Sequence, residues 1–227
     1  MPRYYPMMVD LAGRKCLVAG GGAVAERKAS ILLSFGADVV VVSPELSPGL
    51  KKLADEGKLK HLPRGYRRED LEGTFLAIGA TDDREINGQL ARDARAEGVW
   101  ANVVDSPQDC NFIVPSIVTR GDLLIAISTG GKSPALAKKI RQEMEEIYGE
   151  EYAELLEILG ELRAQVLREV QDPVLRQGIL EGAVNSNLLE RIRAGEGPLI
   201  RKDLRRLWKK ALESHLKRSG GRKGSCP

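Results

Sequence analysis

The feature that most constrains this chain is a glycine-rich turn between an apolar run and a helical pattern. Residues 16–19 are apolar, Gly20-Gly21-Gly22 follow them, and apolar residues then recur at helical spacing as far as Phe35. The spacing Gly20-x-Gly22-x-x-Ala25 is the dinucleotide-binding pattern, with alanine in place of the third glycine. The sequence therefore predicts a strand, a phosphate-binding turn and a helix.

Each small residue of this pattern has a physical reason. Gly20 allows the tight turn, Gly22 lets a diphosphate approach the backbone, and Ala25 lets the helix pack close to the strand. The free N–H groups at the start of the helix then face the diphosphate. Such turns also use glycine for purely structural reasons, but strand, turn and helix occur here in the right order, which favours nucleotide binding.

Strand-like and helix-like segments alternate through the first hundred or so residues. A near-continuous valine run at residues 38–43 is typical of a parallel strand that is covered on both faces. We expect further strands at residues 59–62, 74–79 and 99–104, and helices at residues 23–35, 48–56 and 83–97. This alternation predicts an α/β fold, a doubly wound parallel sheet with right-handed crossovers.

The alternation ends after Asp105. Two further strands are expected at residues 112–115 and 122–128, and Ser133-Pro134 predicts the start of a helix. From about residue 133 onward the pattern is helical, including a helix over residues 150–170. The predicted parts are a nucleotide-binding domain (1–113), a central region (114–147), a helical domain (148–218) and a disordered tail (219–227).

Composition excludes several classes of protein and site. No apolar run reaches the ~20 residues of a membrane span and the N-terminus lacks a signal-peptide pattern, so we expect a cytoplasmic protein. With three widely spaced cysteines and two histidines, neither a disulfide nor a metal site is expected. Residues 201–227 hold ten Lys or Arg against two Asp or Glu, which indicates either a docked terminal helix with solvated charges or a contact with nucleic acid or an acidic ligand.

Polar residues follow three of the predicted strands, at the edge where open α/β sheets bind ligands. Ser43-Pro44-Glu45 comes where an acidic residue usually holds the ribose, and no arginine stands beside it for a 2′-phosphate, which favours NAD over NADP. Thr81 is either part of a helix cap or a cofactor contact. Asp105 is either an ordinary turn residue or a general base.

The segment STGGKS at residues 128–133 looks like a phosphate-binding loop. The Walker pattern fails here, because it needs a glycine at the position of Ala126. What remains is a glycine turn before a capped helix, with Lys132 beside it. This segment is either a plain strand-to-helix turn or a site for carboxylates.

Five segments together resemble one family, the precorrin-2 dehydrogenases and the N-terminal modules of siroheme synthases. They occur in the family's order between about residues 8 and 145, and five in order are specific although any one alone is weak. The segments are residues 18–28 (VAGGGAVAERK), 80–83 (ATDD), 102–107 (NVVDSP), 112–116 (FIVPS) and 127–134 (ISTGGKSP).

The resemblance implies oxidation of precorrin-2 to sirohydrochlorin with NAD, by a homodimer with a Rossmann domain, a central dimerisation region and a helical C-terminal domain. Asp105 falls on the family's catalytic aspartate, which is proposed to take a proton while hydride leaves to the nicotinamide. Residue patterns and resemblance together predict cofactor contacts at Gly20, Gly22, Ala23, Val24, Ser43, Pro44, Glu45, Thr81 and Asn102. The predicted substrate contacts are Arg120, Ser128, Thr129, Gly130, Gly131 and Lys132.

The chemistry agrees with these residues. A tetrapyrrole that carries many carboxylates needs cationic and N–H-rich walls, and Arg120, Lys132, Lys138 and Lys139 lie near the proposed cleft in sequence. The cofactor supplies hydride transfer, so the protein must position the substrate and accept one proton.

Two alternatives remain open. The same protein could also insert Fe2+ into sirohydrochlorin; in the absence of a His/Cys cluster this would rely on the macrocycle's nitrogens and Asp105. The basic end could instead belong to a nicotinamide-sensing regulator that binds nucleic acid, although no helix-turn-helix pattern is recognisable there.

Overall fold

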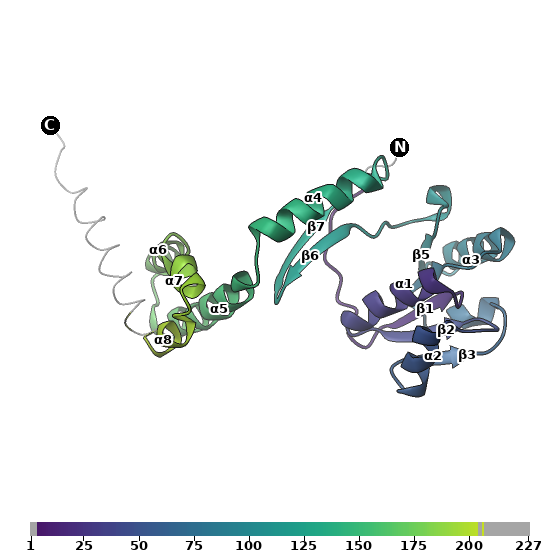
Figure 1. Ribbon diagram of the computed structural model, residues 1–227, viewed down its shortest axis with the longest axis horizontal. Helices are drawn as coiled ribbons and strands as arrows, with labels where there is room; N and C mark the ends of the chain where they lie inside the picture. The colour runs from purple at the N-terminus through teal and green to yellow at the C-terminus, as the bar shows by residue number, and fades with distance from the viewer. Residues whose placement is uncertain (1–3, 204–205, 207–227) are drawn as a thin grey trace. The chain divides into compact units, whose positions relative to one another are not determined.

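The computed structural model describes residues 4–203 and 206 of the 227-residue chain. It divides into two compact units, residues 1–114 and residues 115–227, which we call the nucleotide-binding unit and the second unit (Figure 1). The boundary lies one residue beyond the predicted one. The further division between residues 147 and 148 stays a prediction, as does the tail, which lies outside the described residues.

The nucleotide-binding unit contains a five-stranded parallel sheet in the order β3-β2-β1-β4-β5, as the alternation of segments predicts. Its strands are β1 (Lys15–Ala19), β2 (Asp38–Val42), β3 (Lys60–Leu62), β4 (Leu76–Gly79) and β5 (Trp100–Val103). Its α-helices are α1 (Ala23–Ser34), α2 (Pro48–Asp55) and α3 (Arg84–Ala96). The predicted fold class is thus confirmed for this unit.

The register of the sheet brings the site together. Ala19 pairs with Val42 on one side and with Gly79 on the other, and Gly79 pairs with Val103. The four strands β2, β1, β4 and β5 therefore end in line at one edge. The strand order reverses between β1 and β4, and this crevice is where open α/β sheets bind ligands.

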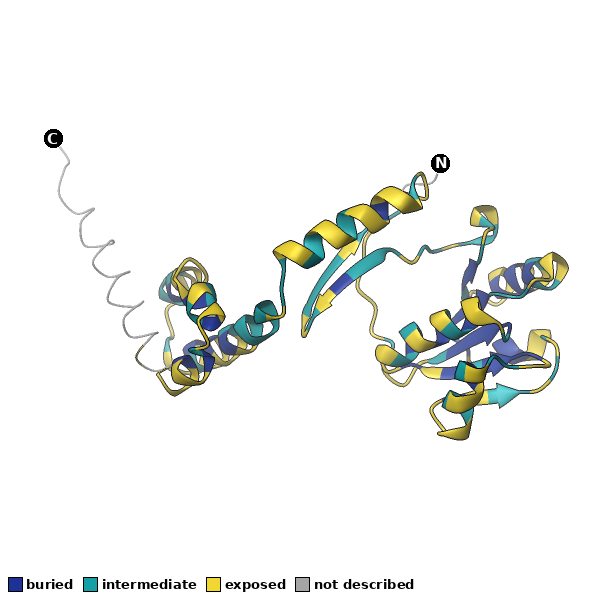
Figure 2. Ribbon diagram, viewed as in Figure 1, coloured by how far each residue is buried: buried dark blue, intermediate teal, exposed yellow. Residues whose placement is uncertain are grey.

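The core of this unit lies on both faces of the sheet. Along β1, Cys16 and Val18 belong to one apolar cluster while Leu17 and Ala19 belong to the other, because successive side chains of a strand point to opposite faces. All four are fully buried, and Figure 2 shows the strands of this unit largely in the buried colour. Burial of both faces explains the continuous apolar runs of β1 and β2.

The second unit opens with a separate antiparallel hairpin of β6 (Ser116–Arg120) and β7 (Leu123–Ile127). The expected strand at residues 112–115 is wrong, whereas the one at residues 122–128 is confirmed. Pro115 has no N–H to give to a ladder, so pairing begins only after it. Gly121, with φ of 55°, forms the turn that reverses the chain.

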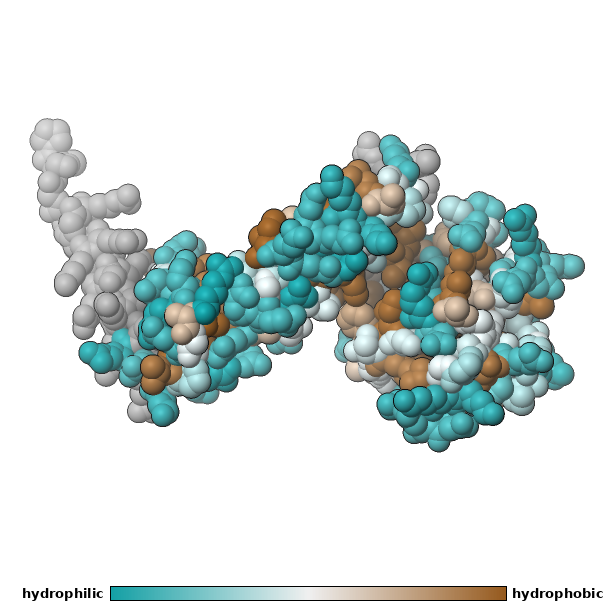
Figure 3. All heavy atoms as spheres, in the orientation of Figure 1, coloured by the Kyte–Doolittle hydropathy of each residue, from teal (hydrophilic) through white to brown (hydrophobic). Residues whose placement is uncertain are grey.

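Helices complete the second unit, as the helical pattern beyond residue 133 predicts. They are α4 (Pro134–Ile147), α5 (Glu151–Glu169), α6 (Pro173–Val184), α7 (Leu188–Arg193) and α8 (Gly197–Lys202). Ile158, Leu162 and Val166 of α5 form a small core with α6, α7 and α8, while Leu167 is 43% exposed. The visible surface of this helical region is mostly hydrophilic (Figure 3). Most of the predicted basic helix lies outside the described residues.

None of the helices that the structure describes has the length and apolar character needed to cross a membrane.

Candidate active site

The glycine turn after β1 is packed between the ends of two neighbouring strands. Gly20 has φ of 124° and its N–H donates to Val42 O at 3.0 Å. A Cβ on Gly20 would lie 2.3 Å from Ala80 O, and one on Gly21 would lie 1.8 Å from Glu45 O. Because no real Cβ atom approaches a backbone oxygen so closely, both positions require glycine.

Gly22 is different, since a Cβ there would meet no atom within 4 Å. Gly22 is the N-cap residue of the 12-residue helix α1, and no side chain caps the first N–H groups of that helix. Free N–H groups, a helix dipole and open space above a glycine form a cradle for a diphosphate. The residues present therefore fit a dinucleotide, with Ala23 and Val24 in the first turn of the helix.

The loop after β2 lies against this turn. Ser47 N donates to Gly21 O at 2.7 Å, and Ser47 Oγ donates to Glu26 Oε2 at 2.5 Å. Ser43 is buried at the end of the strand. Sequence reasoning missed Glu26 as the residue that ties α1 to this loop.

Pro44 and Glu45 are exposed at the surface of the same loop. Together with Ser43, they therefore lie where the adenosine end of a dinucleotide is expected, beside the glycine turn.

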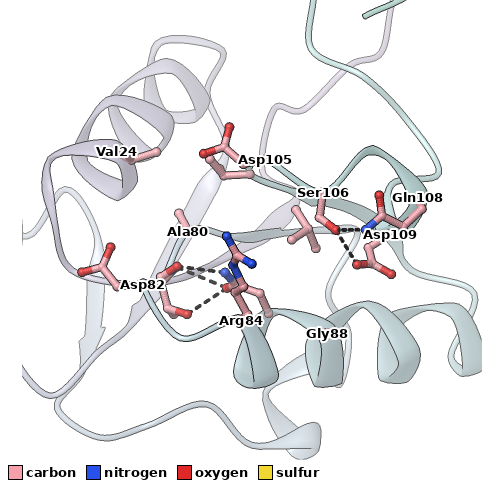
Figure 4. A pocket seen from close by; sticks show the side chains of 13 residues that line it. Val24, Ala80, Asp82, Arg84, Gly88, Asp105, Ser106, Gln108 and Asp109 are labelled. Atoms are coloured by element: carbon pink, nitrogen blue, oxygen red, sulfur yellow. Dashed lines mark hydrogen bonds between the residues drawn. The ribbon is translucent and has the colours of Figure 1, made fainter.

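A pocket of about 530 Å³ opens on the other side of the glycine turn, across the ends of β4 and β5 (Figure 4). It brings together three of the predicted residues, Val24, Thr81 and Asp105. Its lining residues are Val24, Ala80, Thr81, Asp82, Arg84, Asn87, Gly88, Val103, Val104, Asp105, Ser106, Gln108 and Asp109. A dinucleotide whose diphosphate sits on α1 would place its nicotinamide on this side.

Asp105 has an unusual backbone. Its φ of 59° is the only positive φ of a non-glycine residue in the part of the chain that the structure describes. Such a conformation costs about 1–3 kcal/mol and occurs preferentially at functional sites. The side chain is exposed, and among the described residues its carboxylate has no hydrogen-bond or ion-pair partner. Figure 4 shows it between Val24 of α1 and Ser106.

Side chains hold the loop that carries Asp105. Cys110 Sγ accepts from Val103 N at 3.2 Å and lies 3.3 Å from Ser106 O, to which it can donate. Burial raises the pKa of this thiol, so it keeps the proton that it donates. Ser106 Oγ also donates to Asp109 Oδ2 at 2.6 Å, which closes the short helix η2 (Pro107–Asp109).

Asn102 takes part in this framework and is not among the residues that line the pocket. It is buried, and its Nδ2 donates to Phe112 O at 3.1 Å. The structure thus gives the side chain of Asn102 a structural task, and its predicted cofactor contact stays a prediction.

The turn after β4 both caps a helix and lines the pocket. Asp83 caps α3, because its Oδ1 accepts from Glu85 N at 2.8 Å and Ile86 N at 3.2 Å. Thr81 lines the pocket, but its polar groups are bonded to Asn87, a buried residue that sequence reasoning missed.

The predicted substrate residues lie in the second unit, so they are described by themselves. In the loop at residues 128–133, Thr129 Oγ1 accepts from Ser133 N at 3.1 Å, and Ser128 Oγ accepts from Gly130 N at 3.1 Å. Gly130 and Gly131 have positive φ, and Lys132 is exposed. Ser133 caps α4 through Leu136 N, as predicted.

Arg120 is already engaged within the second unit. Its Nη2 donates to Glu145 O at 3.2 Å, and its Nε lies 3.3 Å from Glu150 Oε1, close enough for an ion pair but misaligned for a hydrogen bond. Its predicted contact with substrate stays a prediction.

Within residues 4–203 and 206, no group of three or more His, Cys, Asp or Glu side chains is arranged to hold a metal ion.

Comparison with known proteins agrees with this geometry. Residues 7–116 match the family model described as "Putative NAD(P)-binding", and residues 120–147 match "Sirohaem biosynthesis protein central". The fold and site therefore define a dinucleotide-binding protein of the sirohaem-biosynthesis class.

Related proteins narrow this class. The chain is 40% identical to the siroheme synthase of Methylobacillus flagellatus over 188 residues, 81% of this chain and 40% of that protein. It is 41% identical to the siroheme synthase of Azotobacter vinelandii over 193 residues, 85% of this chain and 42% of that protein. The chain thus spans about two fifths of the length of these relatives.

One solved structure is similar to this chain over a larger share of both chains than these relatives are. The structure of SirC, a precorrin-2 dehydrogenase, aligns with a TM-score of 0.73 and 27% identity, over 92% of this chain and 100% of that one. The chain belongs to the family of precorrin-2 dehydrogenases and siroheme synthase N-terminal modules.

Proposed function

We propose that this chain oxidises precorrin-2 to sirohydrochlorin with NAD as the hydride acceptor. The observation that carries the proposal is the pocket itself. It places the exposed carboxylate of Asp105 beside Val24, in the first turn of the helix whose N-terminus forms the diphosphate cradle. The similarity to a precorrin-2 dehydrogenase over the whole chain of its solved structure supports the same reaction.

The reaction removes two hydrogens from the substrate, one as hydride and one as a proton. When bound, the nicotinamide ring accepts the hydride. The chain's own task is to hold the ring system in place and to accept the proton, and a carboxylate oxygen of Asp105 is the acceptor. Because this side chain is exposed, it can pass the proton on to water after each turnover.

Among the residues that line the pocket, only Arg84 carries a positive charge that could attract an anionic side group of the substrate. Asp82, Asp105 and Asp109 are acidic, and Asp109 is engaged with Ser106. Arg84 is the cation of the lining, and it rises from the start of α3 between Asp82 and the loop of Ser106 and Asp109 (Figure 4).

We further propose that the loop at residues 128–133 and the basic residues Lys132, Lys138 and Lys139 contact the substrate's carboxylates. All three lysines are exposed. Removing their charges together should raise KM for precorrin-2 and leave NAD affinity unchanged, and unchanged KM would reject this contact.

Residues 114–147 are the proposed dimer contact. Leu136 and Ile147 of α4 are 49% and 53% exposed, which suits a surface that a second copy covers. Sedimentation of the purified chain tests this, and a monomer at micromolar concentration contradicts it.

The experiment that tests the main proposal is anaerobic incubation of the purified chain with precorrin-2 and NAD, with sirohydrochlorin and NADH followed by their absorbance. We expect both to appear in equal amounts, faster with NAD than with NADP. NAD binding without turnover would reject the proposed reaction and leave a dinucleotide-binding protein.

Insertion of Fe2+ into sirohydrochlorin is a second candidate, supported by the name siroheme synthase that the relatives carry. Asp105 would then accept pyrrole N–H protons. Adding Fe2+ and sirohydrochlorin to the chain tests it, and a rate equal to the uncatalysed one rejects it. The enzyme names of the relatives favour either activity over the nucleic-acid-binding regulator.

A further inference from the structure

Asn87 stands out among the pocket residues because it is buried and both polar atoms of its side chain form hydrogen bonds. It lies in the first turn of α3 and is 6% exposed. Its Nδ2 donates to Thr81 O at 2.8 Å, and its Oδ1 accepts from Thr81 N at 3.2 Å. The Thr81 hydroxyl lies 2.9 Å from the same Oδ1 and 2.9 Å from Asp83 O.

These bonds account for every polar group of Thr81. One side-chain amide pairs with the backbone N–H and C=O of a single residue, which fixes the orientation of the two peptide groups on either side of Thr81 as a strand partner would. The amide also lies close to the strand, since a Cβ on Gly79 would be 3.1 Å from Asn87 Oδ1. The side chain of Asn87 therefore holds the turn of residues 80–82 through its bonds to Thr81.

That turn is a wall of the pocket. Ala80, Thr81 and Asp82, which follow β4, line the pocket. Figure 4 shows Ala80 and Asp82 on the β4 side and Asp105 on the β5 side. Because Ala80 O also packs against Gly20, a shift of the turn would disturb the glycine cradle and the pocket together.

We propose that Asn87 is a positioning residue, which holds the turn of residues 80–82 in the form that accepts the nicotinamide half of the dinucleotide. The role in turnover rests on the proposed function, but the role in dinucleotide binding does not.

The chemistry predicts which substitutions matter. Asn87→Asp keeps the shape but replaces the donor Nδ2 with an oxygen that faces Thr81 O, so attraction becomes repulsion. Asn87→Ala removes all the bonds and leaves the N–H and C=O of Thr81 without their partner.

Asp93 offers a matched control on the same helix. It is also 6% exposed, and it accepts from Tyr66 OH at 3.0 Å and from Gln89 Nε2 at 2.8 Å. It does not line the pocket. Asp93→Ala therefore removes a comparable buried polar group from α3 at a distance from the turn.

The experiment measures NAD affinity by titration calorimetry, together with Tm, for the wild-type chain, Asn87→Asp, Asn87→Ala and Asp93→Ala. We expect the Kd for NAD to rise about tenfold or more in both Asn87 variants. In Asp93→Ala we expect a lower Tm and a Kd within about twofold of wild type. Wild-type affinity in Asn87→Asp, or an equal loss in Asp93→Ala, would overturn the proposal.

A double-mutant cycle with Thr81→Val separates positioning from loss of fold. Thr81→Val removes the hydroxyl beside Asn87 Oδ1 and leaves the backbone bonds of Thr81 to Asn87 in place. If Asn87 acts by holding Thr81, Thr81→Val should therefore weaken NAD binding less than Asn87→Ala does, and should have little further effect in Asn87→Ala. Additive effects would overturn the proposal, even where Asn87→Ala alone is poorly folded. Turnover with precorrin-2, measured separately on the wild type, tests the reaction and leaves this result unaffected.

Discussion

Two halves of the same sheet edge are built by different means. The glycine half, which comprises Gly20–Gly22 and the loop of residues 43–47, is shaped by backbone contacts and by the lack of side chains. The side-chain half, which comprises the turn of residues 80–83 and the loop of residues 104–112, is held by buried amide, hydroxyl and thiol groups.

The difference follows from what each half must do. A diphosphate needs free N–H groups and open space, which any chain can supply with glycines and a helix start. A proton acceptor needs one side chain at one place, and the strained turn at Asp105 holds it only if its surroundings are firmly fixed. The two halves should therefore respond differently to substitution.

Gly20→Ala should have the largest effect on folding. The new Cβ would lie 2.3 Å from Ala80 O and would sit at φ of 124°. Overpacking and backbone strain together should lower the free energy of unfolding by about 3–5 kcal/mol. Urea denaturation measures this, and a loss below 1 kcal/mol would show that the glycine half tolerates side chains.

Gly22→Ala sharpens the comparison, because it adds the same methyl group where nothing lies within 4 Å. The free energy of unfolding should stay within about 0.5 kcal/mol of wild type. The affinity for NAD should nevertheless fall roughly tenfold or more, since the methyl group fills the cradle. A folded variant with wild-type NAD affinity would contradict the placement of the diphosphate.

Asp70→Asn tests stability away from the site, at the opposite edge of the sheet. Asp70 is buried, Arg64 donates to both of its carboxylate oxygens at 2.5 and 2.9 Å, and Arg67 N donates at 2.9 Å. Burial alone would raise its pKa, but these donors outweigh it and hold the pKa below the usual value. The substitution should cost about 2–3 kcal/mol at pH 7 with NAD affinity unchanged.

The contribution of Asp70 to the free energy of unfolding should depend on pH in a definite direction. Because the pKa of Asp70 is lowered by folding, its stabilisation is present above the ordinary carboxyl pKa and is lost as pH falls through the folded value. The difference in stability between wild type and Asp70→Asn should thus shrink below about pH 4. A difference that stays constant from pH 7 to pH 2 would contradict this explanation.

Cys110→Ala should have the smallest effect. It removes the acceptor of Val103 N and the donor to Ser106 O, so the loop of Asp105 loosens at a cost of about 1 kcal/mol. We expect kcat to fall a few-fold at unchanged NAD affinity, as measured by steady-state kinetics. Loss of NAD binding would contradict this expectation and show that the loop of Asp105 also shapes the dinucleotide site.

The same contrast explains what the sequence could predict. The sheet, the glycine turn and the capped helices follow from local periodicity and turn chemistry, which need few distant partners. The place of Asp105 follows from the rule that parallel strands end at one edge, together with the family resemblance.

What the sequence could not predict depends on which groups meet in space. Nothing local shows that Asn87 turns back to Thr81 or that Cys110 bonds to the end of β5. Asn102 is a polar residue on a strand near the ligand edge, which predicts a cofactor contact, but the sequence does not show that its amide also donates to Phe112 O. The prediction of a strand at residues 112–115 is wrong because it relies on their apolar content and ignores that Pro115 has no N–H for a ladder; the strand begins at Ser116.

The central claim is that the glycine half binds the diphosphate of the dinucleotide while Asp105 of the side-chain half accepts the proton. The most direct test measures NAD affinity and kcat with precorrin-2 on the same preparation of Asp105→Asn. We expect wild-type NAD affinity and a fall in kcat of about 10²–10⁴-fold, the usual contribution of a general base. Wild-type kcat in this variant would contradict the account.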